Sequence, residues 1–127
     1  MRRSDQRREA VFALYQREVT GRALDELLVG AKPFSRELAE GTDAGLERID
    51  PEIERLAEGW ELERIAPLER SILRVALHEI HERDDIPTEV AIDEAVSLAR
   101  EYCGTDAPGF VNGILGSVAR ELEEAKS

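Results

Sequence analysis

The sequence predicts an all-α protein, a compact bundle of about seven helices joined by short connections. Along most of the chain, apolar residues recur three and four positions apart, which is the spacing of an amphipathic helix. No segment alternates apolar and polar residues for long, and the one Asn-Gly pair lies within a helical stripe rather than between β-branched runs. With 127 residues, of which 42% are hydrophobic, the chain is long enough to form one domain with its own core.

Two helices are predicted in the first 30 residues. Ser4 is expected to cap the first helix and Gly21 to end it, because serine accepts hydrogen bonds from helix-start amides and glycine tolerates the conformation of a helix end. The apolar stripe of this helix consists of Val11, Leu14, Tyr15 and Val19. A short second helix ends near Gly30, and its apolar residues are Leu24, Leu27 and Leu28.

Proline positions predict the next two helices. Pro33 opens a third helix, although Gly41 and Gly45 each weaken it by about 1 kcal/mol relative to alanine. Its inward residues are Phe34, Leu38, Leu46 and Ile49. Asp50 and Pro51 then form a cap and first position for a fourth helix. The apolar face of that helix consists of Ile53, Leu56, Ala57 and Trp60.

Three more helices follow. Pro67 opens one whose inward residues are Leu68, Ile72, Val75, Ala76 and Ile80. After a break at residues 84–87, Thr88 caps the next helix, which ends at Gly104. Its apolar residues are Val90, Ala95, Val96 and Ala99. Residues 106–108 start the last helix, whose stripe is Val111, Ile114, Leu115, Val118 and Leu122.

The charge of the first eight residues is opposite to that of the whole chain. They contain Arg2, Arg3, Arg7 and Arg8 against one acid, Asp5, whereas the whole chain carries a net charge of −11. A short arginine cluster is typical of phosphate binding, because guanidinium groups stay charged and bind phosphate bidentately. The acidic remainder repels nucleic acid, so we expect any RNA or DNA contact at one end only.

The sequence offers no catalytic or metal site and no cofactor motif. His78 and His81 are three residues apart, unlike the four-residue spacing of a zinc-binding H-E-x-x-H helix, so a solvated helix face is the favoured interpretation. Cys103 is the only cysteine, and a buried structural role is more common than a nucleophilic one. A single cysteine, no membrane-length apolar run and no signal core together indicate a cytoplasmic protein.

Two aromatic residues have two interpretations each. Phe110 lies at the start of the last helix, one turn after Asp106, and either packs in the core or provides an exposed ring for base stacking. Tyr15 lies two turns after Arg7 and Arg8, and either packs in the core with its hydroxyl at the rim or shares a surface with those guanidinium groups. Spacing alone favours the core in both cases.

The chain resembles the NusB family of bacterial transcription antitermination factors. Four stretches carry the resemblance: the arginine-led residues 7–15, residues 49–53 with Trp60, residues 68–80 with 85–87 and 90–96, and residues 110–115, which begin Phe-Val-Asn-Gly. The resemblance implies two packed helical sub-bundles, which we place at residues 1–49 and 50–127 of a single domain. It also implies a non-catalytic protein that binds single-stranded boxA RNA of ribosomal RNA leaders. NusE, a small-subunit ribosomal protein, binds with it, and RNA polymerase then reads through terminators.

The resemblance also implies a set of site residues. In the family, the arginine-rich start and the beginning of the last helix form the RNA face. The matching residues here are Arg2, Arg3, Arg7, Tyr15, Asp106 and Phe110. The arginines are expected to hold phosphates or base edges, the rings to stack on bases, and the aspartate to accept from a base amino group. Glu69 matches an acidic position at the NusE contact.

Other interpretations remain open at this stage. A NusB-like accessory domain of an RNA methyltransferase shares the helical fold, but would require this sequence to be a fragment, because it has no strand-rich nucleotide-binding half. A homodimer that masks its own RNA face predicts concentration-dependent RNA affinity. A metal-dependent hydrolase using His78 and His81 would need bound metal.

Overall fold

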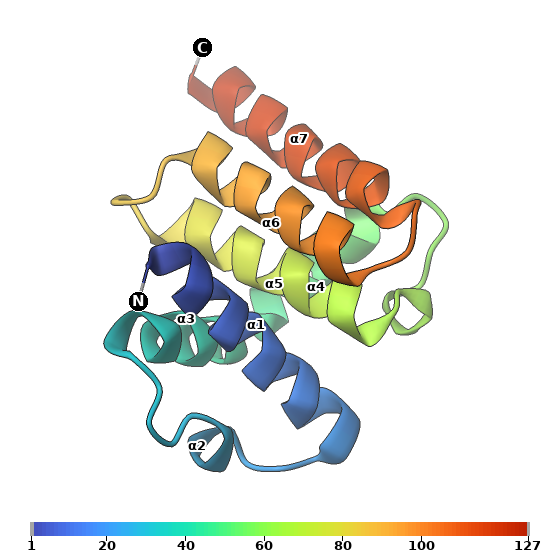
Figure 1. The fold of residues 1–127 in the computed structure, drawn as a ribbon. Helices are drawn as coiled ribbons and strands as arrows, with labels where there is room; N and C mark the ends of the chain where they lie inside the picture. Colours follow the sequence, from blue (N-terminus) through green and yellow to red (C-terminus); the bar gives the residue numbers. More distant parts are fainter. Residues whose placement is uncertain (1, 127) are drawn as a thin grey trace.

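The computed structural model describes residues 2–126, and that part of the chain contains seven α-helices, one 3₁₀ turn and no strand (Figure 1). The predicted all-α class and the number of helices are therefore confirmed. The helices are α1 (Arg3–Thr20), α2 (Leu24–Leu27), α3 (Pro33–Ala44), α4 (Leu46–Leu56), α5 (Pro67–Glu82), α6 (Thr88–Tyr102) and α7 (Ala107–Lys126), with the 3₁₀ turn at Leu62–Arg64.

Helix α5 is the centre of the bundle. It packs against α1, α3, α4, α6 and α7, so it is covered on nearly every side (Figure 1). Its sequence explains this position, because a helix that is apolar around most of its circumference must be buried. Its buried apolar residues are Ile72, Leu73, Val75, Ala76 and Leu77. The predicted division between residues 49 and 50 falls within α4, and the two sub-bundles remain a prediction.

The predicted serine and threonine caps are wrong. Helix α1 already begins at Arg3, and the Ser4 hydroxyl, inside the helix, donates to Glu94 on α6. Thr88 is likewise the first residue of α6 itself, preceded by Pro87 in an extended conformation. No side-chain hydrogen bond caps either helix start. The position of Ser4 is therefore decided by its contact with a neighbouring helix. Capping rules consider only the local sequence and do not include such contacts.

The predicted helix start at Asp50 and Pro51 is also wrong. Helix α3 ends at Ala44, and Pro51 lies inside α4. Asp50 accepts two hydrogen bonds from Arg74 of α5, at 2.8 and 2.9 Å, instead of capping a helix. Burial of apolar residues on both sides of the proline, together with this ion pair, outweighs the loss of one backbone hydrogen bond.

Three apolar residues assigned to inward faces are exposed. Val19 and Val90 lie in terminal turns of α1 and α6, where no neighbouring helix covers them, and are 50% and 41% exposed. Trp60 follows α4 and is 53% exposed, because the chain leaves the helix through Glu58 and Gly59, both with positive φ. Positive φ turns the backbone away from the helical path, so Trp60 no longer shares the face of Ile53.

The two histidines line a hollow of about 590 Å³ between α4 and α5. His81 Nε2 is 2.9 Å from a carboxylate oxygen of Glu52, and this hydrogen bond raises the pKa of His81. Burial lowers the pKa of His78. Within residues 2–126, no group of three or more histidine, cysteine or acidic side chains is arranged to hold a metal ion. No helix in the same range is long and apolar enough to cross a membrane.

The His81–Glu52 contact predicts a pH-dependent stability. Because the folded-state pKa of His81 is raised, its contribution is present below the ordinary pKa of about 6.5 and disappears as pH rises through the folded-state value. We expect His81→Gln to lower the free energy of unfolding by about 0.5 kcal/mol at pH 5.5, a small value because the pair is partly exposed. At pH 8.5 urea titrations of the two proteins should coincide. A difference that is equal or larger at pH 8.5 would contradict the assignment.

Candidate nucleic-acid interface

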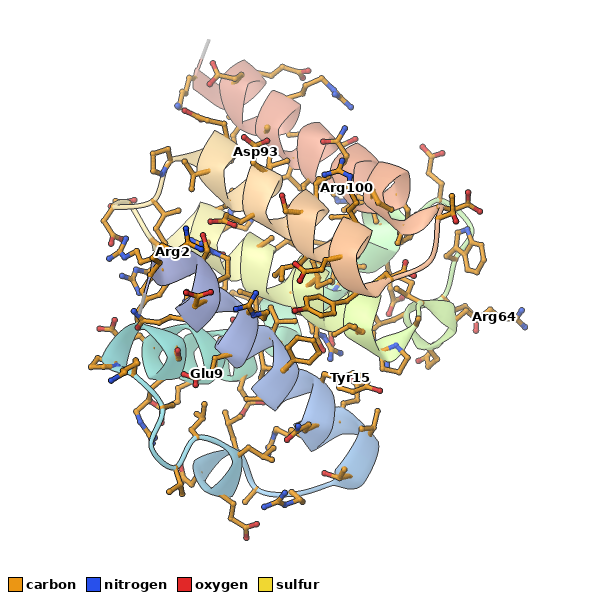
Figure 2. The ribbon with its side chains drawn as sticks, in the orientation of Figure 1. Arg2, Glu9, Tyr15, Arg64, Asp93 and Arg100 are labelled. Atoms are coloured by element: carbon orange, nitrogen blue, oxygen red, sulfur yellow. The ribbon has the colours of Figure 1, made fainter. Side chains whose placement is uncertain are left out.

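The arginine-rich start forms one end of helix α1. The Arg2 side chain is 86% exposed and lies 3.8 Å from Asp5, so it reaches into solvent (Figure 2). The Arg3 guanidinium is about half exposed and donates to Asp85, in the turn between α5 and α6, at 3.1 Å. Arg8 donates to Asp5 at 2.7 Å and lies next to the Tyr102 hydroxyl. Three of the four N-terminal arginines are therefore accessible at the surface.

Arg7 is buried in the free protein, so its guanidinium is not exposed for the predicted contact with RNA, and that contact stays a prediction. Its side chain is only 4% exposed. The guanidinium donates to both carboxylate oxygens of Glu79, at 2.6 to 2.9 Å, and to Glu94 at 3.1 Å. Burial raises the pKa of Glu79, and the hydrogen bonds from Arg7 oppose that rise. With Nε, Nη1 and Nη2 all donating to carboxylates inside the protein, Arg7 joins α1 to α5 and α6 instead of facing a ligand.

An aromatic cluster lies between α1 and the end of α6. The rings of Phe12 and Tyr102 meet edge to face, with centroids 5.0 Å apart, and Tyr102 is 40% exposed. Tyr15 lies one turn further along α1 and is partly buried (Figure 2). Tyr15 is thus neither fully in the core nor fully exposed, and its stacking on bases stays a prediction. Arg8 borders the cluster, so ring faces and a guanidinium group share this surface.

The start of α7 forms a second accessible site. Phe110, Asp106 and Glu69 line one hollow of about 370 Å³, with Trp60 and Arg64 at its edge. Phe110 is partly buried against the core, and its ring lies 6.5 Å from that of Trp60 at an interplanar angle of 65°. Burial raises the pKa of Glu69. The structure thus brings together two residues predicted to bind RNA and the residue predicted to bind the partner.

Asp106 does not serve as a side-chain cap. Its backbone carbonyl accepts from the Phe110 amide at 3.2 Å, while its side chain is exposed in the turn before α7. The carboxylate is therefore free to accept a hydrogen bond from a ligand. Arg64, which lines the hollow with Asp106 and Phe110, lies at the opposite end of the bundle from Arg2, with Tyr15 between them (Figure 2). The predicted residues therefore do not form a single cluster.

Sequence reasoning missed two arginines, Arg64 at the second site and Arg100 on α6. Among the arginines, all of which lie in the described range, only Arg64 and Arg100 make neither an ion pair nor a side-chain hydrogen bond. Figure 2 shows Arg64 pointing away from the body of the protein. No local signal separates these two from the other arginines, because the acidic partners of the others lie mainly on different helices. Trp60 and Tyr102 were missed for the same reason, since their exposure depends on neighbours distant in sequence.

The buried position of Arg7 predicts that it stabilises the fold. Arg7→Met leaves the carboxylate of Glu79 buried and unpaired, so we expect the free energy of unfolding to fall by about 3–5 kcal/mol in urea titrations. Arg2→Met is the matched control and should change stability by less than about 0.5 kcal/mol. Equal stability of the two variants would show that the buried pair does not hold α1 in place.

Comparisons of the sequence and of the fold with known proteins agree with one another. The NusB family model matches residues 4–120. The chain is 40% identical to the transcription antitermination protein NusB of Desulforudis audaxviator, covering 98% of this chain and 97% of that protein. It is 51% identical to that of Heliobacterium modesticaldum, over 76% of this chain and about half (47%) of that protein's length. It also resembles a solved structure of T. maritima NusB, at 34% identity and a TM-score of 0.89, covering 95% and 92% of the two chains.

A crystal structure of the antitermination factors NusB and NusE with double-stranded RNA has the same fold, with a TM-score of 0.82 at 23% identity. It covers 95% of this chain and 99% of the matched chain. The resemblance noted in four separate stretches of sequence thus extends along nearly the whole chain, in sequence and in fold. The chain belongs to the NusB family.

Proposed function

We propose that this protein is a transcription antitermination factor. It binds single-stranded boxA-type RNA of ribosomal RNA leaders together with NusE and promotes read-through by RNA polymerase. The observation that carries the proposal is the match, along nearly the full length of both chains, to a protein named as a transcription antitermination factor. The family also supports a non-catalytic role in the cytoplasm.

The proposed RNA path runs along the outer side of α1 to the start of α7. Arg2 and Arg3 hold phosphates at the exposed end of α1, where both guanidinium groups reach the surface. Tyr15 stacks on bases midway, beside the exposed ring of Tyr102. This order suits a single strand, whose unstacked bases can meet successive rings while its phosphates meet guanidinium groups.

The proposed RNA path ends at the second site, the hollow at the start of α7. Phe110 offers a partly exposed ring for stacking, and the exposed Asp106 carboxylate accepts from a base amino group. The unpaired Arg64 supplies a free donor beside this hollow. Glu69 lies in the same hollow and makes no ion pair, so we assign its carboxylate to NusE. RNA and partner then meet at one place, which explains how each strengthens binding of the other.

Arg7 has a different role in this proposal. Because its guanidinium is saturated by Glu79 and Glu94, it is a positioning residue that sets the orientation of α1. The exposed arginines depend on that orientation. The acidic body repels RNA elsewhere, so we expect modest affinity for the protein alone.

RNA binding should depend on one residue at each end of the path. In fluorescence anisotropy with labelled boxA-like RNA, we expect Phe110→Leu to weaken binding about tenfold through lost stacking. Arg3→Gln should reduce the slope of log K against log salt by about 0.7. Arg22→Gln, an exposed arginine near the opposite end of α1, is the control and should bind like the wild type.

A scrambled RNA and a NusE titration complete that experiment. Sequence-selective binding strengthened by NusE is the expected result. Equal affinity for scrambled and boxA-like RNA in both conditions would overturn the proposed function. Affinity that falls as protein concentration rises would instead indicate a homodimer that masks the RNA face.

Trp60 is an intrinsic reporter of the second site. It is the only tryptophan in the chain, it is half exposed, and its ring contacts that of Phe110. We therefore expect RNA to quench tryptophan emission in proportion to the bound fraction. Binding that is visible by anisotropy but leaves the emission unchanged would place the RNA away from the start of α7.

A further inference from the structure

Three arginine side chains surround one aromatic ring at the exposed end of α1. The guanidinium carbons of Arg3, Arg83 and Arg7 lie 4.3, 5.3 and 5.6 Å from the centre of the buried Phe34 ring. Arg3 belongs to the N-terminal cluster, whereas Arg83 comes from the end of α5, 80 positions away in the sequence. Cation–π attraction holds these groups by their faces and leaves the in-plane N–H donors of Arg3 and Arg83 able to bind an anion, whereas those of Arg7 already donate to Glu79 and Glu94.

Asp85 occupies the donors of two of these arginines. Its carboxylate accepts from Arg83 Nε and Nη2, both at 3.0 Å, and from Arg3 Nη2 at 3.1 Å. These hydrogen bonds, that of Arg83 foremost, hold the pKa of Asp85 well below its usual range. An oxyanion bound bidentately by one guanidinium and singly by another has the donor arrangement that also suits a phosphate.

This carboxylate is at the surface, unlike those that hold Arg7. The side chains of Asp85 and Arg3 are 48% and 53% exposed, so water reaches the contact between them. A surface ion pair such as Arg3–Asp85 is weak, whereas Arg83, whose side chain is 20% exposed, holds Asp85 more firmly through two hydrogen bonds. A phosphate of the RNA backbone therefore competes with Asp85 for these donors, whereas it cannot compete with Glu79 for Arg7.

We propose that Arg3 and Arg83 form a phosphate-binding site for the RNA backbone, and that Asp85 fills this site in the free protein and is displaced by RNA. The proposal rests on the proposed RNA-binding function and adds two residues to it. It also explains how an arginine remote from the N-terminal cluster contributes to the same surface.

The contacts of Arg3 and Arg83 with the Phe34 ring determine whether loss of Asp85 strengthens or weakens RNA binding. Without Asp85, Arg3 and Arg83 still lie against Phe34, and Arg83 also keeps Glu37 at 3.6 Å. The site therefore stays formed, while a negative charge that competes with RNA disappears. Removing Asp85 should consequently strengthen RNA binding, whereas loss of a purely structural contact would weaken it or leave it unchanged.

The test compares two neighbouring aspartates. Asp85→Asn and Asp84→Asn remove the same charge one position apart, but Asp84 makes no ion pair. In anisotropy with boxA-like RNA, we expect Asp85→Asn to bind about two- to fivefold more tightly than the wild type. Asp84→Asn should change affinity by less than half as much, since only the general charge effect remains. Thermal unfolding curves of both variants serve as the control for correct folding.

A second variant tests the site independently of Asp85. Arg83→Gln should weaken binding and reduce the slope of log K against log salt by about 0.7, as expected for one lost phosphate contact on a single strand. In a double variant that combines Asp85→Asn with Arg83→Gln, the gain in RNA affinity from Asp85→Asn should disappear, because the Arg83 donors that it frees are missing.

The outcomes separate this proposal from the proposed function. Normal wild-type binding, together with an Asp85→Asn variant that binds equally or more weakly, overturns the phosphate site and leaves the function intact. Equal gains for Asp85→Asn and Asp84→Asn, or an Arg83→Gln variant with unchanged affinity and salt slope, also overturn it. Absence of sequence-selective binding by the wild type, with and without NusE, overturns both.

Discussion

The buried ion pair between Arg7 and Glu79 is the constraint on which the candidate interface depends. Removing two charges from water is unfavourable unless they pair with good geometry, and here one guanidinium serves both oxygens of Glu79 and one of Glu94. These contacts fix the rotation of α1 about its own axis. Because successive residues of a helix point about 100° apart, an inward Arg7 turns Arg8 toward the surface and leaves Arg3, one turn earlier, at the exposed helix end. The same cluster of arginines therefore supplies both an anchor and surface groups.

Pairing of charges explains why so acidic a protein can still present a nucleic-acid surface. Most arginines are neutralised by acidic residues of their own or neighbouring helices, as Arg74 is by Asp50 and Glu18. Among the described residues, the cations without an ion pair are Lys32, Arg64, Arg100 and Arg120, and the exposed end of α1 adds arginines that are only weakly held. RNA is attracted where donors are exposed or weakly held, and repelled elsewhere. Binding at both ends of one path, with a partner beside the second end, compensates for the small number of free cations.

Much of the architecture was predictable from sequence, because helix periodicity and prolines are local signals. Pro33 and Pro67 do begin helices, and the break before α6 lies at the predicted residues. Predictions failed where a distant side chain decides the outcome. Asp50 pairs with Arg74 rather than capping a helix, and Ser4 binds Glu94. Arg7 shows the same limit within the candidate site, since nothing in its local sequence distinguishes a guanidinium that meets Glu79 from one that meets solvent. Arg83, likewise, joins Arg3 only through the tertiary structure.

The central claim is that RNA binds along the outer side of α1, from its arginine-rich end to the start of α7. The most direct test is a map of backbone amide chemical shifts as boxA-like RNA is added to isotope-labelled protein. We expect the largest changes in the first turns of α1, at the end of α6 and around Phe110. Amides of α4, on the far side of α5, should hardly change. Changes concentrated on α3 and α4, with α1 and the start of α7 unaffected, would contradict it.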